Sequence, residues 1–320
     1  MKRDAVIWAA LTLLVFTLPA FVHSPYYYSV LIIIGIFGIV VLGLTMLIGY
    51  AGQISLGHAG FFGFGAYFSA VLTTRFHLDP WLAMLVGLVA TIVLAFLLGI
   101  PTLKLHGHYL AMATLGLGMV LQIIFKEEVE LTGGPTGLTD VPHLKAFGMV
   151  FASDQKFYFL VWIFLLVLYG LSINLVHSRL GRALRAISSN QTAAGSLGIP
   201  VNRLKLLIFA VSAGYASLAG SLYAHYLSFV NPSPFGFLVS VKLVAMVVIG
   251  GSQSLWGALL GAGLLTALPE FLAVLQDYEM LVYGAILIVM MMFAPQGLAG
   301  ILAGLHEWVK NRDHKKNAQA

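Results

Sequence analysis

Long apolar runs separated by short polar segments dominate the chain. Eight runs have about the length that a helix needs to cross a bilayer: 5–22, 29–49, 81–100, 107–125, 157–176, 206–227, 255–274 and 280–296. Two others are less regular, because 54–74 is rich in glycine and 236–250 is short. The pattern predicts an all-α integral membrane protein with about ten transmembrane helices.

The composition supports a membrane protein. Of the 320 residues, 60% are hydrophobic and only 9% are charged, whereas about a quarter of the residues in a soluble domain are charged. The chain contains no cysteine, which excludes disulfides and thiolate metal sites. No clear cleavage motif follows the run 5–22, so we expect an uncleaved first transmembrane helix.

Charges in the connections predict the orientation, because short cytoplasmic loops are enriched in Lys and Arg. The connection 177–205 is basic and lacks Asp and Glu, and the tail 306–320 is also rich in Lys and Arg. The connection 126–156 holds five of the acidic residues. We therefore expect both termini in the cytoplasm and one transmembrane domain, 1–305, with a cytoplasmic loop at 177–205 and an outer loop at 126–156. The net charge of +5 lies in these connections and predicts no nucleic-acid partner.

Residues 49–58, GYAGQISLGH, interrupt the apolar pattern at the predicted inner membrane face. Glycines break the helix here, and Gln53, Ser55 and His58 bring polar groups into the segment. Non-helical backbone is tolerated at membrane depth only where protein buries it or where it lines a water-filled cavity. Two interpretations stay open: a cytoplasmic turn, and a lining for the substrate pathway. A second glycine-rich break, 249–265, has similar Ser-Leu and Gly spacing and suggests an internal repeat.

The helix after this break carries a stripe of small residues. At about 100° per residue, four of them share one narrow face: Ala59, Gly63, Ala66 and Ala70. Phe61, Phe64 and Phe68 fall on the opposite face. Small side chains let a neighbouring helix approach closely in a membrane, so we expect a packing surface here, with the phenylalanines facing lipid or a bulky neighbour.

Two charged residues lie well inside predicted spans, Lys242 and Glu270. Ionisable groups at such positions are candidates for function and usually have a partner. We therefore expect the two to pair or to line the substrate pathway. The alternative is that both side chains reach to water at the nearby outer face.

The basic connection predicts two short helices. In the first, Leu184 and Ile187 oppose Arg182 and Arg185, which is an amphipathic pattern. The second has Ser189 or Asn190 as its cap. Its small and helix-ending residues are Ala193, Ala194, Gly198 and Pro200. The small residues favour a docking surface for another protein, and the alternative is a lipid anchor formed by the arginines.

The sequence contains no catalytic motif. No Gly is followed by Lys, so the phosphate-binding loop of ATPases is absent, and the H-E-x-x-H and G-x-S-x-G motifs are absent too. We expect a chain without enzymatic activity. A secondary transporter or channel would need a chain of intramembrane acidic or histidine residues, and Glu270 is the one carboxylate within a predicted span.

Taken together, several motifs resemble one known family. GYAGQISLGHAGFFGFGAY, HYLAMATLGLG, LTGGPTGL, VVIGGSQSLWGALLGA and FAPQGL occur in the order found in permease subunits of branched-chain amino-acid ABC importers, over about Val30 to Leu302. Such importers contain a pair of permease subunits, and the resemblance is to the one with the longer outer loop in the middle of the chain. It implies a type II importer fold in a bacterial inner membrane. Urea-type permeases share nearly all these motifs and remain an alternative.

The resemblance also implies partners. These are a homologous second permease, two cytoplasmic ATPase subunits that hold ATP and Mg, and a periplasmic or lipid-anchored substrate-binding protein; the chain itself needs no cofactor. Residues 181–200 match the loop that couples such permeases to the ATPase. The chain departs from the family pattern where relatives often carry charged residues: Ser188, Ser189, Gln191 and Gly195. Lys242 stands where an acidic residue is common.

Overall fold

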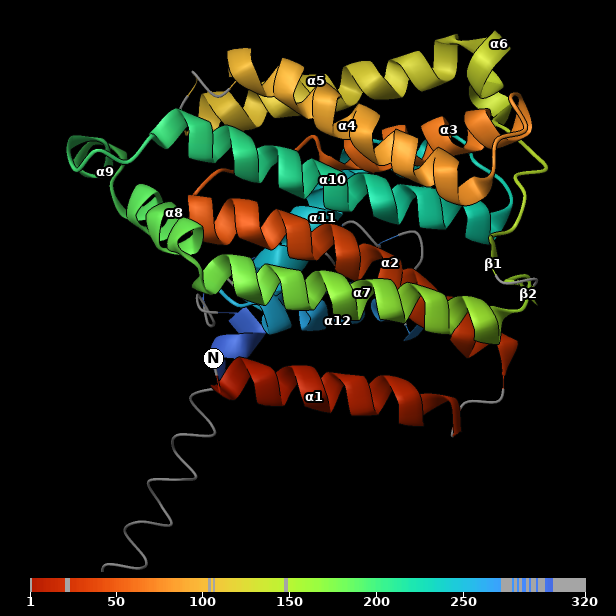
Figure 1. Cartoon of the computed structure of the whole chain (residues 1–320), viewed down its shortest axis with the longest axis horizontal. Coiled ribbons are helices and arrows are strands. Elements are labelled where there is room, and N and C mark those ends of the chain that lie inside the picture. The colour runs from red at the N-terminus through yellow and green to blue at the C-terminus, as the bar shows by residue number, and fades with distance from the viewer. Residues whose placement is uncertain are drawn as a thin grey trace, which may run out of the picture.

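Long helices lie side by side in the computed structural model (Figure 1). The structure describes residues 2–20, 24–102, 105, 107–146, 149–271, 278, 281, 284–285, 288, 292 and 297–301. The predicted span 280–296 is described only at isolated positions. The tail 306–320 lies outside the described residues.

The long helices in the described part follow the apolar runs. They are α1 (Lys2–Thr17), α2 (Pro25–Thr45), α3 (His58–Thr74), α4 (Pro80–Thr102), α5 (His108–Glu127), α7 (Asp154–His177), α10 (Val201–Leu227), α11 (Phe237–Gly250) and α12 (Leu255–Phe271). A π-helical segment, η2 (Met46–Tyr50), continues α2.

Short elements join these helices. They are η1 (Leu18–Ala20), α6 (Val129–Thr132), η3 (Gly134–Thr136), the antiparallel strands β1 (Lys145–Ala146) and β2 (Met149–Val150), α8 (Arg179–Ser189), α9 (Gln191–Ser196) and η4 (Ser233–Phe235).

Five of the described helices are long and apolar enough to cross a membrane. They are Pro25–Tyr50, Pro80–Thr102, His108–Glu127, Asp154–His177 and Val201–Leu227. Val6–Thr17, Phe237–Gly250 and Leu255–Pro269 are shorter apolar helices. The predicted all-α membrane architecture is confirmed, and the count of ten crossings stays a prediction.

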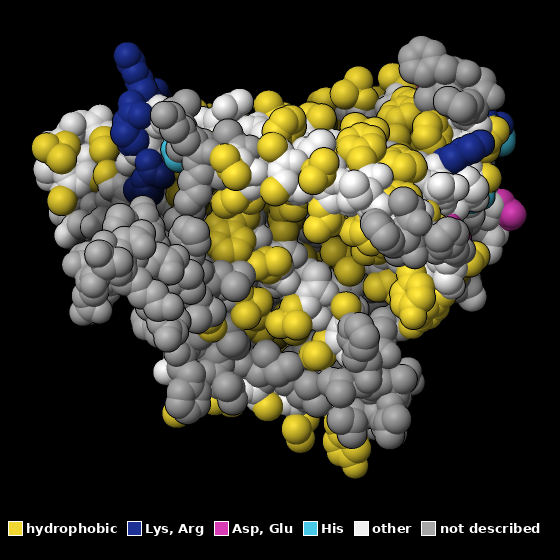
Figure 2. Space-filling view, turned by 90° about the horizontal axis from the view of Figure 1, so that it is seen from below, with side chains coloured by type: hydrophobic (Ala, Val, Ile, Leu, Met, Phe, Trp, Pro, Cys, Tyr) yellow, Lys and Arg dark blue, Asp and Glu magenta, His cyan; other side chains and the backbone are white. Residues whose placement is uncertain are grey.

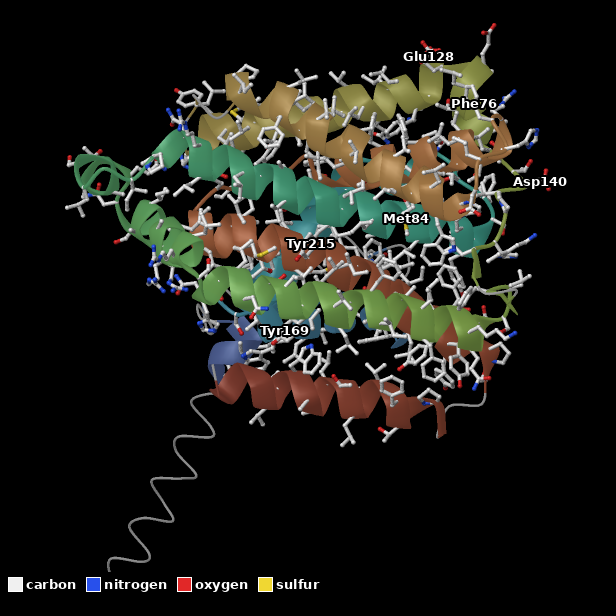
Figure 3. All side chains as sticks on the ribbon, in the orientation of Figure 1. Phe76, Met84, Glu128, Asp140, Tyr169 and Tyr215 are labelled. Carbon is white, nitrogen blue, oxygen red and sulfur yellow. The ribbon has the colours of Figure 1, made fainter. Side chains whose placement is uncertain are left out.

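The two ends of the bundle differ in charge. Helices α8 and α9 project from one end (Figure 1), and basic side chains cluster at this end of the face shown in Figure 2. Glu128 and Asp140 lie at the opposite end, beside α6 and the outer loop (Figure 3). The separation follows the sign of charge expected for loops on opposite sides of a membrane.

The predicted outer loop 126–156 is joined to the end of α10. Leu138 and Val230 exchange backbone hydrogen bonds of 2.8 and 3.0 Å. The Nδ1 atom of His225 lies 2.7 Å from the carbonyl oxygen of Pro142. These contacts hold the part of the loop around Leu138 and Pro142 against the end of α10.

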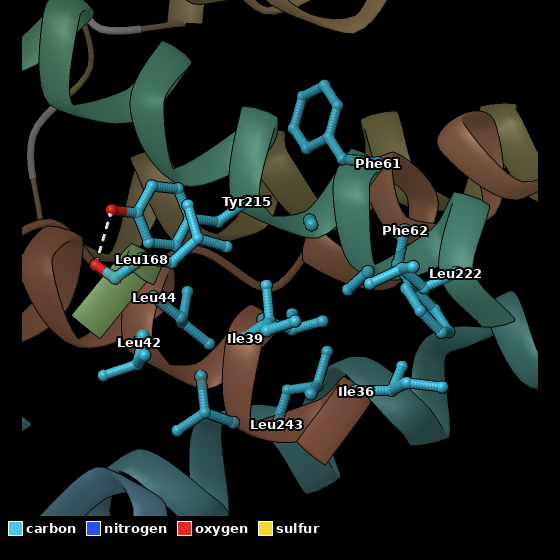
Figure 4. Close-up of a cluster of buried hydrophobic side chains, with 14 of the residues drawn as sticks. Ile36, Ile39, Leu42, Leu44, Phe61, Phe62, Leu168, Tyr215, Leu222 and Leu243 are labelled. Carbon is cyan, nitrogen blue, oxygen red and sulfur yellow. Dashed lines mark hydrogen bonds between the residues drawn. The ribbon is translucent and has the colours of Figure 1, made fainter. Parts of the chain in front are cut away.

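Helix α10 lies at the centre of the bundle and packs against α2, α3 and α4 (Figure 1). A Cβ atom added at Gly220 would overlap with the carbonyl oxygen of Phe62, and one added at Gly65 would overlap with that of Ser217. The backbones of α3 and α10 are therefore in contact, as small residues allow. On the other side, the Tyr215 hydroxyl donates to the carbonyl oxygen of Leu168 on α7 at 3.1 Å (Figure 4).

Candidate functional site

The chain leaves the helical conformation between η2 and α3. Gly52 has a φ of 65°, a left-handed conformation that glycine adopts without a steric cost. Gly57 contacts the backbone of α5, where an added Cβ would overlap with the carbonyl oxygen of Thr114. Gly52 thus allows the local bend, and Gly57 allows the close contact with α5.

The polar side chains of this break are buried. Gln53, Ser55 and His58 are 2%, 2% and 1% exposed. Ser55 Oγ lies 2.9 Å from His58 Nδ1, and His58 Nε2 lies 2.7 Å from Ser212 Oγ on α10. These hydrogen bonds tie the break to the central helix, so its polar side chains face the protein interior, while Ile54 is exposed.

Backbone groups of the same segment bind hydroxyls on two further helices. The amide of Leu56 donates to Thr114 Oγ1 on α5 at 3.1 Å, and the amide of Ala59 donates to Ser240 Oγ on α11 at 3.2 Å. Buried backbone amides need such partners. A role for Gln53, Ser55 and His58 in the substrate pathway stays a prediction.

Replacing His58 with alanine is expected to lower the free energy of unfolding by about 2–3 kcal/mol, because it leaves a cavity and two hydroxyls without their partner. Chemical unfolding of the purified chain in detergent measures the loss. Ser212→Ala should lower the free energy of unfolding less in the His58→Ala background than in the wild type, because the two residues share one hydrogen bond. His108→Ala is the control, since His108 is exposed. Equal stability of His58→Ala and His108→Ala would contradict the expectation.

The two glycine-rich breaks meet in space. A Cβ at Gly49 would overlap with the carbonyl oxygen of Ser252. The Tyr50 hydroxyl donates to the carbonyl oxygen of Gln253 at 2.8 Å. Two segments about 200 positions apart in the sequence thus form one junction. Their spacing suggested a repeat, and nothing in the sequence predicted that they are neighbours.

A cavity of about 550 Å³ lies at this junction. Its polar lining includes Tyr50, Tyr169, His177, Arg185, Ser188, Ser189, Gln253 and Ser254. Its other described lining residues are Gly49, Ile173, Val176, Leu255 and Trp256. Tyr169 lies on α7 (Figure 3). Gln53, Ser55 and His58 are not among the lining residues, so the predicted pathway residues and this cavity are separate features.

Helix α8 is tightly joined to the end of α7. Ser178 Oγ accepts hydrogen bonds from the amides of Leu180 and Gly181 and so caps α8. Leu184 and Ile187 are buried, as the amphipathic pattern indicates.

Two of the three arginines of α8 turn back to α7. Arg182 Nη1 donates to the carbonyl oxygen of His177, and Arg185 Nη1 donates to that of Val176, both at 3.2 Å. These carbonyls belong to the last turn of α7, where a positive charge is favourable. The Arg185 guanidinium also lies 5.9 Å from the centre of the Tyr50 ring, which joins α8 to the first break.

Helix α9 forms the tip of the connection 177–205 (Figure 1). Asn190 caps it by accepting from the amide of Ala193 at 3.0 Å. Ala194 is buried and Ala193 is exposed. Leu197, just after the helix, is 81% exposed. Gly198 then reverses the chain with a φ of 81°, and Pro200 precedes α10.

The structure describes the side chain of one of the two predicted intramembrane charges. Lys242 is half-buried on α11, with its Nζ atom 5.7 Å from the centre of the Phe37 ring on α2. Glu270 belongs to α12, but its side chain lies outside the described residues. Their pairing therefore stays a prediction.

The stripe of small residues on α3 lies in the interior. Ala59, Ala66 and Ala70 are buried, and a Cβ at Gly63 would come within 2.6 Å of the Phe235 ring. Phe61 packs against Phe209 of α10 with ring centres 5.5 Å apart, so its neighbour is a bulky protein side chain. Phe64 and Phe68 are half-buried.

Comparison with known proteins reveals relatives along most of the chain. A family model described as the permease component of branched-chain amino acid transport systems matches residues 26–291. The chain is 36% identical over 281 residues to LivM of Salmonella typhimurium, a high-affinity branched-chain amino acid transport system permease protein, covering 80% of this chain and 66% of LivM.

Shorter relatives are matched over more of their length. LivH of Escherichia coli is 28% identical over 287 residues, which cover 82% of this chain and 91% of LivH. BraD of Pseudomonas aeruginosa is 28% identical over 284 residues, with the same coverage. The chain thus spans 66% of the length of LivM. No solved structure matches it.

Proposed function

The chain belongs to the family of permease components of branched-chain amino acid transport systems, and we propose that it is the membrane-spanning permease subunit of an ABC importer for branched-chain amino acids. It is a multi-pass protein of a bacterial inner membrane. Ten crossings, a type II importer fold and cytoplasmic termini are parts of this proposal. The names of the relatives favour a branched-chain amino acid over urea as the solute.

The observation that carries the proposal is the link between α8 and the first glycine-rich break. A Cβ at Gly52 would come within 3.3 Å of the Ser188 Cα atom, so the end of α8 lies against the break. A partner that moves α8–α9 would therefore push directly on the backbone between α2 and α3. An importer driven by ATP hydrolysis on a separate subunit needs such a connection between an exposed surface and the membrane interior.

The proposal includes partners. LivM and LivH relatives both match the chain, which supports a pair of related permease subunits. Two cytoplasmic ATPase subunits would hold ATP and Mg, and a periplasmic or lipid-anchored binding protein would deliver the solute. Within this chain, α8, α9 and Leu197 would form the surface for the ATPase.

Uptake by the reconstituted importer tests the proposal. Proteoliposomes that hold this chain, its second permease and the ATPase are expected to accumulate labelled leucine when the binding protein and ATP are supplied. Unlabelled isoleucine should compete and urea should not. Accumulation against a gradient by this chain alone would contradict the proposal, and so would competition by urea in place of isoleucine.

Leu197→Asp is expected to weaken ATPase binding at least about tenfold, because it places a charge where an apolar side chain would be buried. Co-purification and titration of the ATPase with the permease pair in detergent measure the affinity. Leu131→Asp is a matched control, because Leu131 is also exposed but lies on α6 at the opposite end. Similar effects of the two substitutions would contradict docking at α9.

A further inference from the structure

The cavity of about 550 Å³ beside α8 has the properties of a site for a phosphate anion. We propose that it binds the headgroup phosphate of an anionic phospholipid from the inner leaflet. The inference rests on the charge of the lining, on the division of the lining into polar and apolar parts, and on the place of the cavity at the basic end of the bundle.

The ionisable side chains of the lining favour an anion. Among the described residues they include Arg185, which is positively charged, and His177, and the described lining holds no Asp or Glu. A guanidinium has five N–H donors, and the bond to Val176 engages one nitrogen of Arg185. The remaining donors are available to a phosphate, for which the planar fork of arginine is well suited.

The neighbourhood adds to this positive potential. Arg179 and Arg182 are exposed on the same helix, and basic side chains gather at this end of the face in Figure 2. Helix α12 begins with Leu255 at the cavity, so the positive end of its dipole borders the same space. Basic pockets between helices at the cytoplasmic side are characteristic of sites for anionic headgroups.

The lining also changes from polar to apolar. Ser188 and Ser189 belong to α8, outside the membrane-spanning helices, whereas Ile173, Val176 and Trp256 belong to α7 and α12. A phospholipid has the same division, with its phosphate next to its acyl chains. A free amino acid fits less well, because the described part of the lining offers no carboxylate for its ammonium group.

A bound lipid would also bridge several elements. The cavity wall includes α8, η2 through Gly49 and Tyr50, and the second break through Gln253. A phosphate held by Arg185 would therefore lie between the surface proposed for the ATPase and the junction of the two breaks. Anionic lipid would stabilise one position of α8 relative to that junction.

Native mass spectrometry of the full-length chain in detergent tests the proposal. The chain is titrated with phosphatidylglycerol or with phosphatidylcholine of the same acyl chains, and the affinity for the first bound lipid is compared. Wild type is expected to prefer phosphatidylglycerol at least about fivefold, the effect of roughly one basic contact. Arg185→Gln should abolish most of this preference, and Arg203→Gln should retain it, because Arg203 is exposed and does not line the cavity.

Ser189→Glu provides a second variant. Ser189 is exposed on the cavity wall, so the new carboxylate is expected to repel the phosphate without disturbing the fold. An unchanged preference in both Arg185→Gln and Ser189→Glu would overturn the proposal, and Ser189→Glu decides alone if Arg185→Gln does not fold. Millimolar inorganic phosphate separates the sources of the anion: a lipid site keeps its phosphatidylglycerol, whereas displacement would identify a site for free phosphate and overturn the lipid assignment.

Discussion

Reversing two of the three charges of α8, with Arg182→Glu and Arg185→Glu, is expected to abolish ATP-driven leucine uptake while the chain still inserts into the membrane. In the wild type, the two guanidinium groups donate to the last carbonyl oxygens of α7. Glutamates in their place would face those oxygens with negative charge, at the helix end where a negative charge is unfavourable. Helix α8 would then lose its fixed position against the first glycine-rich break, and ATP hydrolysis on the partner would no longer drive uptake.

Parallel measurements of uptake and of ATP hydrolysis in the same proteoliposomes check this expectation. Hydrolysis is expected to continue, and uptake is expected to fall more than about tenfold, to the level without ATP. Arg203→Glu is the control, because it reverses an exposed charge of the same connection that has no contact with the end of α7 among the described hydrogen bonds. Normal uptake by the double variant would show that the arginines serve only as a lipid anchor.

Gly220→Val is expected to have the largest effect on stability, lowering the free energy of unfolding by about 3 kcal/mol or more. The added side chain would overlap with the Phe62 carbonyl oxygen, which belongs to the backbone of α3 and cannot turn away as a side chain can. Separating α3 from α10 would also lengthen the hydrogen bond from Ser221 Oγ to the Gly65 carbonyl oxygen, which is 3.1 Å.

Thermal unfolding in detergent, together with the yield of monodisperse protein, measures this effect. Gly116→Val is the matched control, because Gly116 also lies within a long helix, α5, and an added Cβ there would meet no atom within 4 Å. Both variants share the change in helix propensity, so their difference reports the contact between α3 and α10. Equal midpoints of thermal unfolding for the two variants would contradict a backbone contact between α3 and α10.

The sequence by itself determined the elements of the described part. Apolar runs became the long helices, because a backbone in lipid must satisfy its hydrogen bonds within the helix. The break at 49–58 and the two short helices after His177 were also predictable, since glycine and capping residues act over a few positions. Asn190 and Gly198 illustrate this, because each sets the conformation of the chain beside it.

Only the tertiary structure decided which elements meet. His58 and Ser212 are hydrogen-bonded across 154 positions, and Tyr50 reaches Gln253 across 203. Neither pair has a signal in the sequence. The hydrogen bond of Arg185 was equally hidden: its side chain is exposed, as the amphipathic pattern of α8 indicates, but its guanidinium donates to the carbonyl oxygen of Val176, nine positions back. The physical reason is that lipid and protein interior are both apolar: hydropathy shows that a helix avoids water, but it does not distinguish the side that faces lipid from the side that faces another helix.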